Sequence, residues 1–178
     1  MTTTKLKIRV YGDPCLRKKS SPVKSVGASE RLLIKNMLET MYEHKGIGLA
    51  APQVGINEQI FVADVGDGPV AVINPRITKK RGSEVMEEGC LSIPGVLIKI
   101  KRPKKIFVSY LDENNNKIQR HCDGLLARVI LHETDHLKGK LIIEYTSLRQ
   151  KLKLRKQLKA IRAQSGENKN NPNITPSI

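Results

Sequence analysis

The sequence feature that most constrains the fold is an apolar segment with helical spacing, residues 124–139, which carries two histidines and a glutamate. Asp123 is a candidate N-cap and Gly139 a candidate end. The spacing places on one face Leu125, Leu126, Val129, Ile130 and Leu137. Because a helix with such a face buries it against other elements, we expect this helix at the centre of the molecule.

The motif HETDH at 132–136 lies on this helix. His132 and His136 are four residues apart and share a helix face, so both imidazoles can reach one metal ion. Glu133 lies about 100° around the helix, near enough to act on a water without ligating the metal. The alternative is a pair of hydrogen-bonded core histidines. We favour the metal site because two unpaired imidazoles are costly to bury in an apolar helix.

A catalytic dication usually takes three protein ligands and keeps one position open, so a third ligand is needed. A metzincin-type protease would place a histidine at position 142, which is Ile142 here. A thermolysin-like protease would use a downstream acid, yet residues 149–162 contain none, and Glu144 follows too soon. Both protease hypotheses are therefore disfavoured.

Cys90 is the remaining candidate for the third ligand. We expect it in a loop after a strand, where its thiolate would suit a borderline-soft dication. Spacing alone leaves this assignment open. Cys15 and Cys122 are interpreted as small buried hydrophobic residues. An odd number of cysteines without a secretory signal argues against disulfides and for a cytoplasmic protein.

The remaining pattern predicts an α+β fold, with short antiparallel or mixed β-sheets around the histidine-bearing helix. An N-terminal amphipathic helix is expected at 29–44, capped by Ser29, and a C-terminal helix at about 147–164. A hairpin turn is expected at 113–117. Strands are expected at 59–65, 69–75, 96–100, 105–112 and 117–123. We expect a single catalytic domain over 1–164 and a disordered tail over 165–178.

The charge is the strongest deviation in composition, with 32 Lys and Arg against 17 Asp and Glu. Seven of the basic residues fall within 149–162, where no acidic residue occurs. Such a segment attracts polyanions, although a solvated helix face is an equal alternative because no nucleic-acid motif accompanies it. No apolar run is long enough to predict a membrane span.

Three segments together resemble the signature segments of the peptide deformylase family: GIGLAAPQVG (46–55), EGCLSIPG (88–95) and HETDHLKG (132–139). The similarity extends over roughly residues 8–150. It implies a metal-dependent hydrolase that removes the formyl group from the N-terminal formylmethionine of nascent polypeptides and releases formate. The bond cleaved is a linear amide, so the enzyme is not a peptidase.

The resemblance also implies roles for individual residues. The metal ligands would be Cys90, His132 and His136, and Glu133 would be the acid/base. Gln53 and the backbone N–H of Leu91 would hold the oxyanion. Fe(II) is the usual metal of the family, and Zn, Ni or Co can occupy the site. The substrate-binding positions would be Gly46, Ile47, Gly48, Met86, Gly89, Leu125 and Val129, although plain core or turn roles would also explain them.

Some positions differ from the family or have no clear role. Arg128 stands one turn before His132, and we expect it at the pocket rim or paired with an acid such as Glu88. Leu97 stands where many relatives carry arginine, which leaves the preference beyond methionine open. The helix over 149–162 resembles one that docks on the ribosome.

We therefore expect a monomer that acts on nascent peptides. The alternative is a protein with a structural metal that binds ribosomal RNA. An intact Gln53 and Glu133 argue against that alternative.

Overall fold

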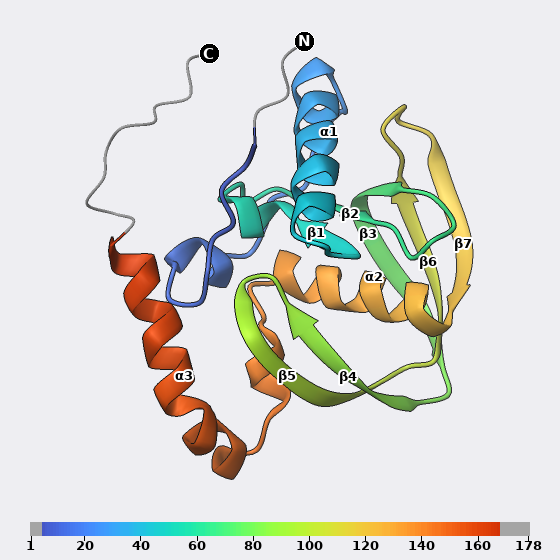
Figure 1. Ribbon diagram of the computed structural model, residues 1–178. Helices are drawn as coiled ribbons and strands as arrows, with labels where there is room; N and C mark the ends of the chain where they lie inside the picture. The colour runs from blue at the N-terminus through green and yellow to red at the C-terminus, as the bar shows by residue number, and fades with distance from the viewer. Residues whose placement is uncertain (1–4, 168–178) are drawn as a thin grey trace.

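The computed structural model describes residues 5–167 and contains three α-helices and two antiparallel sheets. The larger sheet has the order β1 (Gly48–Ala50), β2 (Ile60–Ala63), β3 (Val70–Arg81), β6 (Lys105–Leu111) and β7 (Lys117–Asp123). The smaller is a hairpin of β4 (Glu84–Cys90) and β5 (Ile93–Arg102). Helix α2 (Gly124–Leu137) lies between the two sheets (Figure 1). The expected combination of helices and antiparallel sheets is confirmed.

Helix α2 packs its apolar face on the larger sheet. Its residues Ala127, Ile130 and Leu131 share a buried cluster with Phe61 and Val108 of that sheet. The opposite face of α2 lies toward the β4–β5 hairpin (Figure 1). It carries His132 and His136, which contact Glu88 and Cys90 of β4. Because the helix is covered on both sides, the histidines are buried although they are polar.

Helix α1 (Ala28–Glu43) packs against β1 and β2 through Met37 and Met41, both fully buried. The expectation that Ser29 caps this helix is wrong, because the N-cap is Gly27. The Gly27 N–H donates to the carboxylate of Glu30 at 2.6 Å, so the acid at the third helical position satisfies the free amide instead of a serine hydroxyl.

The strands differ from the predicted ranges: β3 and β5 are longer, whereas β2 ends at Ala63, two residues before its predicted end. Strand β3 continues past Pro75, because the pairing with β2 ends at Ile73 and a register shift in the pairing with β6 lies between Ile73 and Arg76. Proline is tolerated at such an irregularity, where no ladder hydrogen bond is lost. Strand β1 was not expected, and the strand expected before Cys90, for which no bounds were predicted, is β4. The turn between β6 and β7 has Asn115 in a left-handed conformation, inside the predicted range 113–117.

Helix α3 (Leu148–Glu167) buries Leu158 and Ile161 against β5 and the short helix η3 (Ile142–Tyr145). Ser147 caps it, since its hydroxyl accepts the N–H of Gln150. The helix extends three residues into the predicted tail over 165–178, and Ser165 within these residues is buried. Residues 168–178 lie outside the described part.

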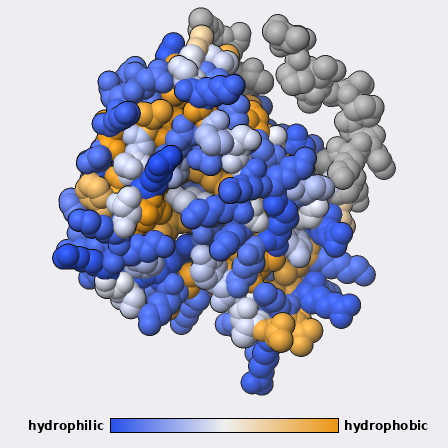
Figure 2. All heavy atoms as spheres, turned by 180° about the vertical axis from the view of Figure 1, so that it is seen from behind, coloured by the Kyte–Doolittle hydropathy of each residue, from blue (hydrophilic) through white to orange (hydrophobic). Residues whose placement is uncertain are grey.

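Two short 3₁₀ helices complete the fold, η1 (Pro14–Arg17) and η2 (Ala51–Val54). The face opposite to that of Figure 1 is mostly hydrophilic, with apolar residues scattered over it (Figure 2). No helix among residues 5–167 is long and apolar enough to cross a membrane.

Gly139 is predicted to be essential for stability. It has φ +71° just after α2, and a Cβ there would overlap the backbone carbonyl of Arg17. We expect Gly82→Ala, with φ +64° but only ordinary contacts, to lower the free energy of unfolding by about 1–2 kcal/mol. Gly139→Ala should lower it by about 1–3 kcal/mol more. Equal losses in urea unfolding would contradict the close contact.

Candidate metal centre and substrate cleft

The ligand atoms of Cys90, His132 and His136 lie within 4.8 Å of one another. The Cys90 sulfur is 3.2 Å from Nε2 of His136, and the two imidazole centroids are 5.1 Å apart. The histidines are adjacent because they lie one turn apart on α2. The structure therefore brings the three predicted ligands into one cluster.

The prediction that Cys90 lies in a loop is wrong, because Cys90 is the last residue of β4 and pairs with Ile93 of β5. A register shift separates this pair from that of Glu88 with Ile98. Glu88 and Cys90 are two residues apart on the strand, so both face the same side of the hairpin. That side is the one toward α2.

His132 is oriented by Glu88, whose carboxylate lies 3.0 Å from its Nδ1. This contact leaves Nε2 as the ring nitrogen able to ligate a metal, the arrangement common among metal-bound histidines. His136 presents Nε2 toward Cys90, and its buried Nδ1 has no partner among the described residues. The donor set therefore fits a dication.

The electrostatics of the cluster also fit a cation. Burial lowers the pKa of His132, but hydrogen bonds with Cys90 and Glu88 outweigh it and raise that pKa well above the usual value. Burial lowers the pKa of His136 well below its usual value, which keeps this imidazole neutral as a ligand must be. Positive charge is therefore stabilised between Cys90 and Glu88, and a metal ion would supply it in place of a proton.

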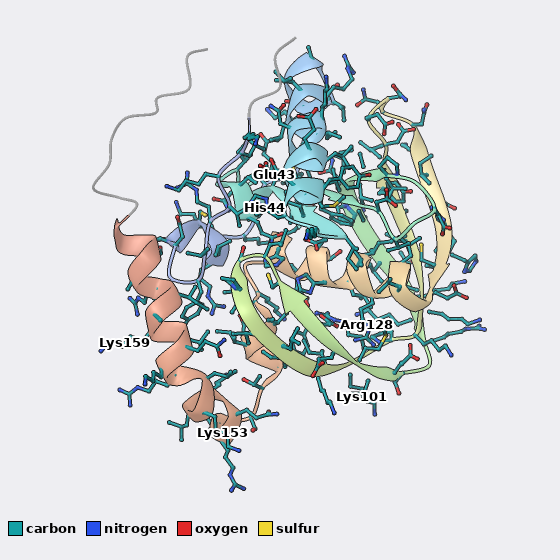
Figure 3. All side chains as sticks on the ribbon, in the orientation of Figure 1. Glu43, His44, Lys101, Arg128, Lys153 and Lys159 are labelled. Carbon is teal, nitrogen blue, oxygen red and sulfur yellow. The ribbon has the colours of Figure 1, made fainter. Side chains whose placement is uncertain are left out.

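Glu88 itself is held ionised. Burial raises the pKa of its carboxyl, but hydrogen bonds from His132 and Arg102 lower it to about 2. Arg128 donates to the same carboxylate at 2.7 Å, so the expected pairing of Arg128 with Glu88 is found. Arg128 lies between α2 and the hairpin (Figure 3), and also donates to the backbone carbonyls of Ile100 and Glu84.

Glu133 is buried beside the cluster, and burial raises the pKa of its carboxyl to about 7. One of its oxygens has no partner among the described residues. Gly48 of β1 lies against the other, because a Cβ at Gly48 would overlap the carboxylate and come within 2.8 Å of Val129. A glycine is therefore required at position 48 for the strand to pass this close to Glu133.

Gln53 lies in η2 and also contacts Cys90. Its side-chain oxygen accepts the N–H of Ala50 at 2.8 Å, which fixes the amide. The amide nitrogen is then directed at the Ser92 hydroxyl, at 3.2 Å, and at the Cys90 sulfur, at 3.6 Å. A donor held in this way can stabilise negative charge that develops beside the cysteine.

A cavity of about 540 Å³ opens on this cluster. All the residues predicted for the site line it except His136, which lies behind them: Gly46, Ile47, Gly48, Gln53, Met86, Gly89, Cys90, Leu91, Leu125, Val129, His132 and Glu133. A side chain the size of methionine fits such a volume. Leu97 is exposed beside Gly89, with a methyl group 3.2 Å from where a Cβ of that glycine would lie.

Sequence reasoning missed several residues around the cluster. His44 and Lys45 line the cavity at the end of α1 (His44 is labelled in Figure 3), and Ser92 contacts Gln53. Arg102 was also missed, because in the run KIKRPKK nothing distinguishes a buried arginine from exposed lysines. The alternation of β5, which buries Ile98, Ile100 and position 102, is the signal that finds it.

A buried pair of histidines, a cysteine and a glutamate at the wall of a cavity define a metallohydrolase site. The sequence matches the polypeptide deformylase family over residues 5–152. A peptide deformylase from Thermotoga maritima is 49% identical over 153 residues, which cover 85% of this chain and 93% of the relative. The chain therefore belongs to the polypeptide deformylase family, enzymes that remove N-formyl groups.

Solved structures agree with this assignment. The crystal structure of the Thermotoga maritima peptide deformylase has a TM-score of 0.79 and 48% identity, covering 81% of this chain and 99% of that one. That of a Legionella pneumophila peptide deformylase has a TM-score of 0.85 and 33% identity, covering 95% and 100%. A Synechococcus elongatus peptide deformylase in complex with actinonin has a TM-score of 0.79 and 40% identity, covering 93% and 91%.

The cluster predicts that the chain binds one divalent ion through Cys90. We expect Cys90→Ala to weaken binding by more than the about 10–100-fold that loss of an orienting partner costs. Cys15→Ala is the matched control, because Cys15 is half-buried and contacts the Pro52 carbonyl, outside the cluster. Competition with a chromogenic chelator measures both affinities. Equal affinities would exclude Cys90 as a ligand.

Proposed function

We propose that the chain hydrolyses the formamide bond of N-formylmethionyl nascent peptides with Glu133 as acid/base and Cys90, His132 and His136 as metal ligands on α2 and β4. The observation that carries this proposal is the convergence of the three ligand atoms within 4.8 Å, beside a buried carboxylate at the wall of a cavity. A dication at these ligands supplies Lewis acidity and an activated water.

Glu133 accepts a proton from the attacking water and returns it to the departing amine. Its carboxyl is suited to both steps, because an acid/base works best when its pKa lies near the working pH. Burial raises that pKa to about 7. One oxygen of Glu133 is buried without a partner among the described residues, so no hydrogen bond from the protein competes there with the water for the carboxylate.

Gln53 and the backbone N–H of Leu91 stabilise the oxyanion that forms from the formyl oxygen. The amide nitrogen of Gln53 is directed toward Cys90, and Leu91 follows Cys90 directly in the chain. Because Ala50 fixes the Gln53 amide, little reorganisation is needed as negative charge develops.

The peptide backbone of the substrate pairs with the segment Gly46–Gly48, and the methionine side chain enters the cavity. Strand β1, which begins at Gly48, is at the edge of the larger sheet, so its free edge can pair with an extended peptide. The walls available to the methionine side chain include Met86, Gly89, Leu125 and Val129. A formyl group is small enough to lie between Glu133 and Cys90 while these contacts hold the rest.

We also propose that Fe(II) is the physiological ion, with Zn, Ni or Co as substitutes. One thiolate and two imidazoles suit all four ions. Iron beside a thiolate would make the enzyme sensitive to oxygen, and anaerobic purification tests this.

Glu133→Gln tests the proposed base. We expect it to lower kcat for formate release from a formyl-Met peptide by about 10²–10⁴-fold, because the amide cannot accept the water's proton. Metal content should stay unchanged. Glu113→Gln, in the exposed turn before β7, should leave kcat unchanged. Retained activity in Glu133→Gln would remove Glu133 from the mechanism.

We propose further that the chain is a monomer and that its helix α3 binds the polyanionic surface of the ribosome. Lys153 and Lys159 project away from the molecule (Figure 3), and Lys156 is exposed on the same helix. Their charge would favour contact with ribosomal RNA in the cytoplasm.

A matched pair of charge reversals tests this role. Replacing Lys153, Lys156 and Lys159 by glutamate should weaken co-sedimentation with ribosomes by about tenfold or more at low salt, with a smaller effect at high salt. The control replaces Lys18, Lys24 and Lys35, which are also exposed, and changes net charge equally. Equal weakening by both sets would show that only net charge matters.

A further inference from the structure

The candidate metal ligands come from two elements that no backbone hydrogen bond holds together among the described residues. Cys90 ends β4, while His132 and His136 lie on α2. The distance between the cysteine and the histidines is therefore set by side chains that bridge the hairpin and the helix.

Arg102, the last residue of β5, is the centre of that bridge. Its side chain is 4% exposed, and its guanidinium donates twice to Glu88, from Nε at 2.7 Å and from Nη2 at 3.0 Å. Its remaining nitrogen, Nη1, donates to Asp135 on α2 at 2.7 Å. A bidentate pair fixes both position and orientation of the carboxylate that holds His132.

Asp135 and Tyr145 hold Arg102 from the other side. The Tyr145 hydroxyl donates to the Asp135 carboxylate at 2.7 Å, and the guanidinium carbon of Arg102 lies 4.8 Å from the Tyr145 ring centroid. The contacts form a closed ring, from His132 through Glu88 and Arg102 to Asp135 and back along α2 to His132. Such a ring permits only one spacing between hairpin and helix.

We propose that Asp135 and Tyr145 are positioning residues that set the metal affinity of the site by fixing Arg102 against Glu88. The proposal rests on the metal-binding role proposed above. Neither side chain lines the cavity. Loss of either leaves Arg102 free to move, so that Glu88 no longer holds His132 in one orientation and the metal must order the imidazole when it binds.

The test uses Asp135→Asn and Tyr145→Phe in the full chain. Tyr145→Phe keeps the ring against Arg102 and removes only the hydroxyl, so it should fold even if Asp135→Asn does not. The control is Tyr42→Phe, because the Tyr42 hydroxyl donates to Asp64 at the same 2.7 Å and neither residue lines the cavity. Comparing Tyr145→Phe with Tyr42→Phe separates the general effect of losing a Tyr–Asp hydrogen bond from the effect of losing the one between Tyr145 and Asp135.

Metal affinity is measured by chelator competition with Zn(II), and ligand geometry by the visible absorption of the Co(II) form. We expect Asp135→Asn and Tyr145→Phe to weaken Zn(II) binding by about 10-fold and to alter the Co(II) spectrum, with no change in Tyr42→Phe. Thermal unfolding of the metal-free proteins reports any general loss of stability.

An unchanged Zn(II) affinity and Co(II) spectrum in Tyr145→Phe would overturn the proposal, whatever happens to thermal stability. Equal weakening in Tyr42→Phe would overturn it as well. Formate release by the wild-type chain is measured in parallel. Its absence would count against the proposed function, whereas normal release with unchanged metal binding in Tyr145→Phe would count against the positioning role alone.

Discussion

The site depends on one buried carboxylate. Glu88 accepts hydrogen bonds from Arg102 and Arg128 and contacts Nδ1 of His132, so a strand, two arginines and the histidine helix meet at two oxygen atoms. A carboxylate is costly to bury without partners, but here each oxygen has at least two. The interaction therefore both satisfies a buried charge and aims a metal ligand.

Buried ion pairs contribute little net stability when compared with well-packed apolar groups, although breaking one is costly. Three clusters of aliphatic side chains supply the packing here, one around α1, one under α2 and one between the hairpin and α3. The main role of the Glu88 interactions is then to select one arrangement of the hairpin and the helix, not to add stability. They determine how the hairpin sits against α2, and thus where Cys90 lies relative to His132 and His136.

The sequence predicted the cluster of Cys90, His132 and His136 better than the boundaries of the strands. The spacing of His132 and His136 and the helical pattern around them follow from local geometry, so these were found directly. A strand was expected before Cys90 but without bounds, because its residues are mostly charged, and the pairing of β4 with β5 is what extends it to Cys90. Arg102 was overlooked within a run of lysines, although the alternation that buries Ile98 and Ile100 on β5 also places position 102 on the buried face. Gln53 and Leu91 came from the family resemblance, since no local pattern marks them.

The most direct test of the central claim is the anomalous scattering of a crystal of the chain loaded with Zn(II) or Co(II). The account predicts one strong peak, ligated by the Cys90 sulfur and by Nε2 of His132 and of His136, with Glu88 still at Nδ1 of His132 and one position left to solvent. A peak elsewhere, or a fourth protein ligand that closes the site, would contradict it.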